Sequence, residues 1–531
     1  MKCTCLAGRR AIRAINIAAA PFAAACMTTV ASAVAPAETV RARATTTMST
    51  TSATATAAAA AAAGDPTPGT GLSLVLKVGD VIEGLPGAVV AMESMAVDDS
   101  GTAVVQVRMG PANPSADQFV IRGDDVVMAE GSPLPGAPAF TVVGFGDLRA
   151  ASNGSVVQVV NLSGPGFSGL AVTVDGVPVL ATGAPATLFG APANGVWSDF
   201  DLAVPRSDGR VTVRGTVTGD GLTLDAVADL FILGGQVILQ TTRLLEGQSV
   251  DGRGIAGRIS SDREDLAVSP DGSVLLSVDI DGAPSGSDGL MAWRPPGQTW
   301  MAVGREGSPS PAAGRNWSSL FNRSVAVNDA GDWALQGSLS GDSSTNQLLV
   351  RNGEVFAQEG EILDVGDDQF ALQGFGSGPL HLLAGGRLVW LADWNATIGF
   401  DRGLFVERDL LVRAGESLVD GVDFGAGPVD GVLVSGLEAA TGNWSASSTG
   451  AWVVARATLR DPNGADVPAL LRVLVLGPCA ADFDGNDAID FLDLVHVLVA
   501  VSIGTADGDV DGDGDTDFAD LVLVLATWGA C

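Results

Sequence analysis

The chain of 531 residues has no tyrosine, only two histidines and few basic residues. Its 29 Lys and Arg residues stand against 61 Asp and Glu residues, which gives a formal net charge of −32. This excess of negative charge disfavours nucleic acid and an anionic membrane surface as partners. Aromatic sugar-binding platforms would have to come from the ten Trp residues, several of which lie in core-like apolar runs. Beyond the N-terminal region, no apolar run reaches the roughly 18 residues that indicate a membrane span.

The first 35 residues have the pattern of a secretory signal peptide. Basic residues precede an Ala-rich apolar run, and small residues end it at Ala33 and Ala35. This order is typical of an exported protein. The sequence therefore predicts a signal peptide over residues 1–35 and a secreted, extracellular or cell-surface protein. In an alternative interpretation, Ala23 to Cys26 is a lipoprotein cleavage site and Cys26 carries a lipid.

Cysteine is also scarce, with five residues in the chain. Signal-peptide cleavage would remove Cys3, Cys5 and Cys26 and leave only Cys479 and Cys531. Two cysteines that flank one small module of an exported chain most simply form one disulfide that joins its ends. We therefore expect a separate module over residues 479–531.

The segment that follows the signal peptide has no core-forming residues. Residues 36–70 are mostly Ala, Thr, Ser and Pro, without apolar periodicity. Such a composition cannot bury enough apolar surface to fold. We predict a flexible linker over 36–70 and a folded body over 71–478.

The body repeats one phrase: a small apolar pair, a polar turn that ends in Gly, and an alternating strand. Ala267-Val-Ser-Pro-Asp-Gly272 and Ala326-Val-Asn-Asp-Ala-Gly331 are two copies. The turn glycines are 53 to 64 residues apart, a period typical of propeller blades. The predicted equivalent glycines are Gly101, Gly154, Gly209, Gly272, Gly331, Gly386 and Gly450.

Hairpin signals within each repeat complete the prediction of the fold. Asn-Gly and Asp-Gly pairs, as in Arg351-Asn-Gly353 and Val174-Asp-Gly176, join adjacent strand-like runs. Four strands per repeat and seven repeats predict a mainly β, seven-bladed β-propeller-like ring, which leaves few exposed sheet edges. The strand at Leu72 would complete a blade begun near the end of the body, at Trp452 and Leu470. A β-helix or two stacked sandwiches are the alternatives.

The last module contains one acidic loop twice, with the second copy 27 residues after the first. Twelve-residue loops bind Ca²⁺ through oxygens at positions 1, 3, 5, 7, 9 and 12. The sequence predicts two Ca²⁺ ions. The first would be held by Asp482, Asp484, Asn486, the carbonyl of Ala488, Asp490 and Asp493, and the second by Asp509, Asp511, Asp513, the carbonyl of Asp515, Asp517 and Asp520. The sharp turn at position six favours Gly514 over Asp487, so we expect the second site to bind more tightly.

Each loop leads into one apolar helix, predicted over residues 491–501 and 518–528. The helix that would precede each loop of an EF-hand is missing, since a strand-like run and Gly-Pro478 lie before the first loop. Duplicated loop-helix units bracketed by Pro-Cys and Trp-Gly-Ala-Cys resemble the GC-type dockerin of secreted bacterial, especially planctomycete, proteins. The body resembles the repeat regions that often precede such modules. The resemblance implies a calcium-dependent partner, either a cohesin-like protein or another surface receptor.

The apolar helix positions lead to a more detailed expectation. Phe491, Leu494, Val495 and Leu498 match Phe518, Leu521, Val522 and Leu525 at the spacing of one buried helical stripe. We therefore expect the two Phe residues to pack the helices together. Leu492, His496 and Val499 would then form an outer apolar patch.

The sequence contains no recognisable catalytic motif. His381 lies in a predicted strand and His496 in a helix of the last module, and we find no nucleophile elbow and no histidine pair for a metal. A glycosidase needs two carboxylates. The candidates are Asp201, Glu264, Asp265 and Asp393, but most acidic residues of the body lie in turns that Asp stabilises locally.

These observations favour a secreted, non-enzymatic binding or scaffold protein, anchored to a partner protein or the cell surface through the calcium module. The alternative is a polysaccharide hydrolase or lyase with catalytic carboxylates in the central channel. In either case a polysaccharide is a candidate ligand. Two acids in one wet cleft would favour the enzyme, and a channel of backbone and small residues would favour the binding protein.

Overall fold

The structure is a computed structural model that describes residues 72–530 with short gaps. The gaps are residues 111–114, 187–192, 207, 234–235, 245–248, 251, 260–265, 270–271, 281, 285–286, 321–323, 329, 366–367, 377–378, 384–385, 396–400, 439–443, 448–450, 476–480, 482, 484–487, 504–507, 509, 511–515 and 527. The predicted signal peptide, the predicted linker and Cys479 and Cys531 lie outside the described residues. Within them, no helix has the length and apolarity to span a membrane.

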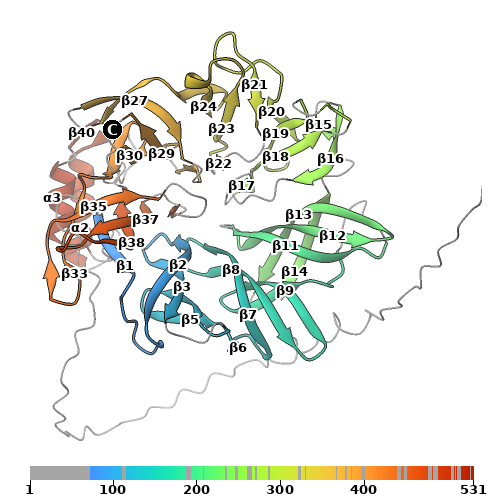
Figure 1. Ribbon diagram of the computed structural model, residues 1–531, viewed down its shortest axis with the longest axis horizontal. Helices are drawn as coiled ribbons and strands as arrows, with labels where there is room; N and C mark the ends of the chain where they lie inside the picture. The colour runs from blue at the N-terminus through green and yellow to red at the C-terminus, as the bar shows by residue number, and fades with distance from the viewer. Residues whose placement is uncertain are drawn as a thin grey trace, which may run out of the picture.

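Seven antiparallel sheets follow one another around a central axis, so the predicted seven-bladed propeller is confirmed (Figure 1). In the first three blades the innermost strand is continuous. Blade 1 contains β2 (Ala88–Val97), β3 (Ala103–Gly110), β4 (Gln118–Arg122) and β5 (Asp125–Ala129). Blade 2 contains β6 (Pro133–Leu134), β7 (Ala137–Ala150), β8 (Val156–Gly164), β9 (Phe167–Val174) and β10 (Val177–Ala181). Blade 3 contains β11 (Val196–Pro205), β12 (Arg210–Gly219), β13 (Leu222–Leu233) and β14 (Gln236–Leu244).

In the next three blades the innermost strand is split into an outer and an axial piece that pair with the same neighbour. Blade 4 contains β15 (Ser249–Val250), β16 (Arg253–Ile259), β17 (Leu266–Val268), β18 (Val274–Ile280), β19 (Gly289–Arg294) and β20 (Met301–Arg305). Blade 5 contains β21 (Trp317–Ser319), β22 (Val325–Val327), β23 (Trp333–Leu339), β24 (Gln347–Arg351) and β25 (Glu354–Gln358). Blade 6 contains β26 (Ile362–Val365), β27 (Asp368–Phe375), β28 (His381–Leu382), β29 (Leu388–Trp394), β30 (Arg402–Val406) and β31 (Asp409–Arg413).

The seventh blade joins the two ends of the described body. It contains β32 (Leu418–Val419), β35 (Val432–Leu437), β36 (Trp444–Ala446), β37 (Trp452–Arg460), β38 (Asp466–Leu474) and β1 (Leu72–Lys77), beside a small hairpin of β33 (Val422–Asp423) and β34 (Pro428–Val429). The first strand of the body pairs antiparallel with the last, with Leu72 opposite Val473. The predicted closure is therefore confirmed.

The repeated phrase forms the same turn in each described copy. The N–H of the turn glycine donates to the carbonyl three residues earlier at 2.9–3.2 Å, with φ between +74° and +94°. Glycine adopts this left-handed conformation without the steric cost that a Cβ brings. The six glycines with this geometry are Gly101, Gly154, Gly209, Gly272, Gly331 and Gly386, while Gly450 lies outside the described residues.

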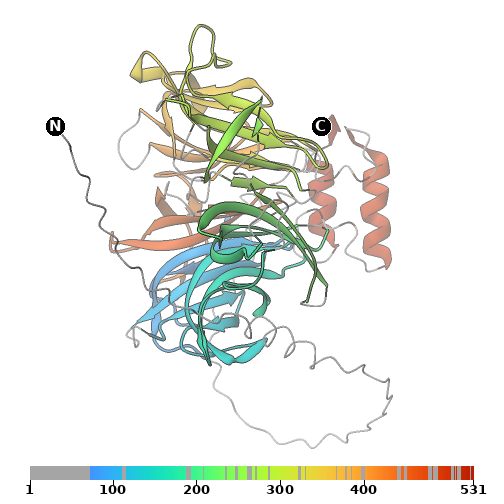
Figure 2. The same cartoon turned by 90° about the vertical axis from the view of Figure 1, so that its right-hand side faces the viewer.

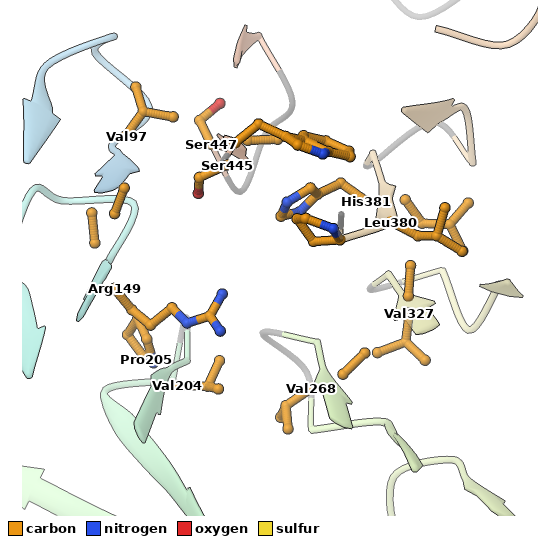
Figure 3. Close-up of a pocket in the computed structure, with 18 of the residues that line it drawn as sticks. Val97, Arg149, Val204, Pro205, Val268, Val327, Leu380, His381, Ser445 and Ser447 are labelled. Atoms are coloured by element: carbon orange, nitrogen blue, oxygen red, sulfur yellow. The ribbon is translucent and has the colours of Figure 1, made fainter. Parts of the chain in front are cut away.

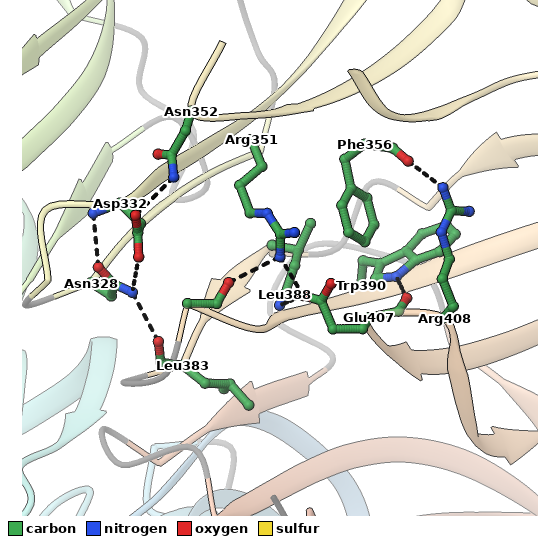
Figure 4. Close-up of polar contacts among 11 residues, drawn as sticks. Asn328, Asp332, Arg351, Asn352, Phe356, Leu383, Leu388, Trp390, Glu407 and Arg408 are labelled. Atoms are coloured by element: carbon green, nitrogen blue, oxygen red, sulfur yellow. Dashed lines mark hydrogen bonds and ion pairs between the residues drawn. The ribbon is translucent and has the colours of Figure 1, made fainter. Parts of the chain in front are cut away.

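Neighbouring blades are linked by backbone and side-chain hydrogen bonds. A second set of glycines, which follows the outer strand of a blade, donates at 2.7–2.9 Å to the innermost strand of the next blade. These glycines are Gly79, Gly131, Gly183, Gly307, Gly360 and Gly415. Between blades 5 and 6, Asn328 donates to the carbonyl of Leu383 at 3.0 Å and Arg351 to the carbonyl of Gly386 at 3.1 Å (Figure 4).

The apolar core is divided into seven clusters, each shared by two consecutive blades. The cluster that closes the ring joins Trp452 and Leu470 of blade 7 to Val105 and Met109 of blade 1. Alternating strand residues point to opposite faces of a sheet, so each blade contributes to the clusters on both sides. Each fully buried aliphatic side chain contributes about 1.5–3 kcal/mol. Seven of the ten Trp residues are buried, as the sequence indicated.

The C-terminal module is a small helical unit. It contains β39 (Ala488–Ile489), α2 (Phe491–Ile503), α3 (Phe518–Ala526) and β40 (Gly529–Ala530), and its two short strands pair antiparallel. The two helices lie side by side (Figure 2). Each begins at the residue the sequence predicted, although α3 ends before residue 528.

Candidate functional site

A cavity of about 210 Å³ lies on the axis of the propeller, and all seven blades contribute to its wall. The lining comes from the axial ends of the innermost strands β2, β7, β11, β17, β22, β28 and β36 and the residues that follow them. The turn glycines start the next strand of each blade, so they bring the same part of every repeat to the axis.

One repeat position faces the axis in every blade, five residues before the turn glycine. We call these seven residues the axial ring: Ala96, Arg149, Val204, Ala267, Ala326, His381 and Ser445. Four of them are Ala or Val, which suits a narrow space between converging strands. The other three carry polar side chains, so the ring is chemically asymmetric.

His381 extends from β28 into the cavity (Figure 3). Its side chain is half-buried, and its ring lies 4.8 Å from that of Trp444. The Nε2 atom is itself buried and has no hydrogen-bond partner in the described part of the chain. Burial in the channel and, secondarily, the positive charge of Arg149 lower the pKa of His381 from 6.5 to about 3. The imidazole is therefore neutral at neutral pH.

Arg149 extends from β7 into the same cavity (Figure 3). Its Nε atom lies 3.3 Å from Oδ2 of Asp147, a carboxylate that is almost fully buried. The same oxygen accepts from the N–H of Ala203 at 3.4 Å. These contacts hold one edge of the guanidinium, and among the described residues no hydrogen bond involves its two Nη atoms, which point into the cavity.

Of the carboxylates suggested by the sequence, the two that the structure describes lie outside the lining of this cavity. Asp201 lies on β11, 3.6 Å from Nε of Arg214, and burial raises its pKa. Asp393 pairs with Arg402 on the neighbouring strand. Glu264 and Asp265 lie outside the described residues. Among the described lining residues, Asp147 is the one acidic side chain.

The sequence placed His381 in a predicted strand and did not single out Arg149. The structure shows that this strand is the axial one, so that His381 lies in the lining of the cavity. The sequence signal that identifies these residues is the alignment of the seven repeats with one another. Aligning the seven copies on their turn glycines places Arg149, His381 and Ser445 at one position, where the other copies have Ala or Val.

Five of the twelve predicted calcium ligands are described: Ala488, Asp490, Asp493, Asp517 and Asp520. The other seven, Asp482, Asp484, Asn486, Asp509, Asp511, Asp513 and Asp515, lie outside the described residues. Within the described part, no group of three metal-ligating side chains forms. The predicted disulfide likewise lies outside it.

The last acidic residue of each loop has the same surroundings in both copies. Asp493 accepts from the N–H of Phe483 at 2.6 Å and of Asp490 at 2.8 Å. Asp520 accepts from the N–H of Val510 at 2.6 Å and of Asp517 at 2.7 Å. Both carboxylates are fully buried. The duplication in the sequence is therefore a duplication of geometry at these residues, and the oxygen-rich donor set of the loops suits Ca²⁺.

The predicted packing of the two helices is wrong for most of the stripe, although Leu494 and Leu521 pack against the core of the module as expected. Phe491 and Phe518 are 65% and 75% exposed, and Val495, Leu498, Val522 and Leu525 are exposed with them. The buried residues are Asp493, Val497 and Ala500 on α2 and Asp520 and Val524 on α3. The loop hydrogen bonds turn Asp493 and Asp520 inward, and this rotation moves the Phe stripe to the surface. Leu492, His496 and Val499 are exposed, as expected.

Comparison with known proteins gives similarity to solved propellers alone. No family model matches the chain, and no curated protein matches it significantly. The Dos1 propeller is 9% identical, with a TM-score of 0.33 over 71% of this chain and 92% of that one. The polysaccharide lyase Uly1 is 9% identical, with a TM-score of 0.32 over 75% and 94%. A sialidase of Trypanosoma rangeli is 10% identical, with a TM-score of 0.27 over 79% and 62%. These similarities are weak, and the description of the fold rests on the seven sheets themselves.

Proposed function

We propose that the protein is a carbohydrate-active propeller that binds a saccharide in the axial cavity and cleaves it as a lyase. The observation that carries this proposal is the neutral imidazole of His381 in a cavity that also holds Arg149. A cavity that served only the fold would need no more than the small apolar residues found at four of the seven axial-ring positions. Of the two functions expected from the sequence, the carbohydrate-active one is thus the better supported.

The acidic residues of the cavity distinguish elimination from hydrolysis. Two-carboxylate hydrolysis requires an acid and a second carboxylate on opposite sides of the bond. Asp147 is the one described acid in the lining, and its carboxylate is held by Arg149 and the N–H of Ala203. A proton-abstracting imidazole needs no second carboxylate.

The elimination step is balanced without a cofactor or oxidant. The neutral imidazole of His381 takes a proton from a sugar carbon, and the C–H electron pair forms a C=C bond to the neighbouring carbon. The C–O glycosidic bond at that neighbour breaks, and the departing oxygen takes a proton from the imidazolium or from water. The products are one unsaturated sugar and one new hydroxyl end.

The direct test is an assay of the full chain on acidic and neutral polysaccharides, in which ultraviolet absorbance detects the unsaturated product. We expect product from the wild type and none from His381→Gln. The matched control is His496→Gln, which changes the other histidine of the chain and should leave the rate unchanged. New reducing ends without ultraviolet absorbance would mean hydrolysis, and no cleavage of any polymer would exclude the enzyme.

The second candidate is a secreted, non-enzymatic binding or scaffold protein, anchored by a calcium-loaded dockerin-like module. The identical hydrogen bonding of Asp493 and Asp520 favours it, because it indicates two equivalent loop-helix units. Deletion of residues 479–531 should then release a folded body from the cell or complex. If the truncated and full-length proteins partition identically, the module is not an anchor.

A further inference from the structure

We propose that Arg149 is the anchor of an anion subsite, so that the saccharide bound in the axial cavity carries a carboxylate, and that binding of this carboxylate is coupled to proton uptake by His381. This inference rests on the proposed function, because it names the substrate class and the pH response of the same cavity.

The geometry of Arg149 fits a carboxylate. Its guanidinium is a planar fork, and Asp147 occupies the Nε side only. The two Nη atoms are left to face the cavity (Figure 3). Two parallel N–H donors match the two oxygens of a carboxylate, whereas a neutral hydroxyl offers one acceptor atom and no charge.

The site holds this cation inside a strongly acidic protein. The formal net charge is −32, so an anionic polymer is repelled by most of the surface. Among the described lining residues, the charged or titratable groups are Asp147 and Arg149 on β7 and His381 on β28. The linings from β2, β11, β17, β22 and β36 add none. Recognition of an anion is therefore assigned to one guanidinium.

The position of His381 links anion binding to protonation. Burial and, after it, the positive charge of Arg149 disfavour the imidazolium form of His381. A bound carboxylate neutralises the charge of Arg149 and adds a negative one, so it raises the pKa of the imidazole. Where the pH lies above this raised pKa, the imidazole stays neutral and is a stronger base for the proposed elimination; where the pH lies below it, a proton enters the cavity with the anion.

Calorimetric titration of the full chain with galacturonate and with galactose tests the subsite without requiring cleavage. We expect galacturonate to bind, galactose to bind far more weakly, and Arg149→Gln to lose about 10- to 100-fold in affinity for galacturonate. Arg149→Lys keeps the positive charge but loses the planar pair of donors. Its affinity for galacturonate should lie between those of the wild type and Arg149→Gln. The control is Arg460→Gln, which removes an exposed guanidinium outside the cavity lining, with no change expected. Thermal unfolding of each variant verifies that it is folded.

Proton uptake is measured by repeating the titration in two buffers of different ionisation enthalpy. The binding heats should differ for the wild type and coincide for His381→Gln. Equal affinities for galacturonate and galactose, an unchanged Arg149→Gln, or equal binding of a sulfated sugar would overturn the carboxylate subsite. Equal heats in both buffers for the wild type would overturn the coupling.

The two proposals can fail separately. Cleavage that depends on His381 but not on Arg149 would leave the proposed lyase standing and overturn the subsite. Binding of galacturonate that depends on Arg149, without cleavage of any uronate polymer, would support the subsite and overturn the lyase.

Discussion

Arg149 and His381 occupy the same position of two different repeats, each five residues before a turn glycine, and their side chains enter one cavity from β7 and β28. The strands belong to blades 2 and 6, so more than half of the body separates them in sequence. The ring brings them together because closure places every innermost strand at the axis. Burial at the axis and the positive charge of Arg149 both disfavour the protonated form of His381, and this leads to the first prediction.

The stability of the protein should decrease as the pH falls below the usual pKa of histidine, in part because of His381. Its pKa is lowered from 6.5 to about 3 on folding, so between these values the unfolded chain binds a proton that the native protein does not. The native state therefore loses stability as the pH falls through this window. His381→Gln should reduce the slope of unfolding free energy against pH between 7 and 5, by at most about 1.4 kcal/mol per pH unit.

His496→Gln is the control for this measurement, because it removes the exposed histidine of the module. Denaturant unfolding at several pH values gives the slopes. If the slope of unfolding free energy against pH is the same in the wild type and in His381→Gln, the pKa of His381 is not lowered on folding.

Two turn glycines with the same backbone conformation should differ in their response to alanine. Both have positive φ, +78° at Gly101 and +76° at Gly209, so alanine strains the backbone at each by about 1–2 kcal/mol. A Cβ on Gly101 would also lie 2.6 Å from the ring of Trp452, whereas one on Gly209 would meet nothing within 4 Å. We expect Gly101→Ala to cost about 1–3 kcal/mol more than Gly209→Ala. Equal losses in denaturant unfolding would mean that Trp452 does not pack on the turn.

The calcium interpretation of the C-terminal module predicts two binding events in a calorimetric titration of the full chain. Asp520→Ala should remove the tighter one and Asp493→Ala the weaker one, because each residue closes a single loop. Each variant also loses two hydrogen bonds to loop N–H groups. Removing calcium from the wild type with a chelator should loosen the module while these hydrogen bonds remain possible, because the loop carboxylates then repel one another without a cation between them. No uptake at micromolar to millimolar calcium would contradict the interpretation.

The sequence predicted the architecture well because local rules determine it. The turn glycines, the Asn-Gly hairpin at Asn352 and the pairing of Leu72 with the last strand follow from periodicity and backbone conformation. The cavity was harder to predict, because Arg149 and His381 enter the same cavity only when the ring of blades closes. The helix packing failed for a related reason. Apolar spacing suggested that Phe491 and Phe518 were buried, but the loop hydrogen bonds of Asp493 and Asp520 determine how each helix is rotated.

The measurement that tests the axial site most directly is the titration of His381 by NMR. The chain has two histidines, so the variant His496→Gln leaves a single imidazole to follow. Without ligand, we predict that His381 titrates far below 6.5, near 3, and that saturating galacturonate raises its pKa. A value near 6.5 that galacturonate does not move would contradict the account of a neutral base controlled by Arg149.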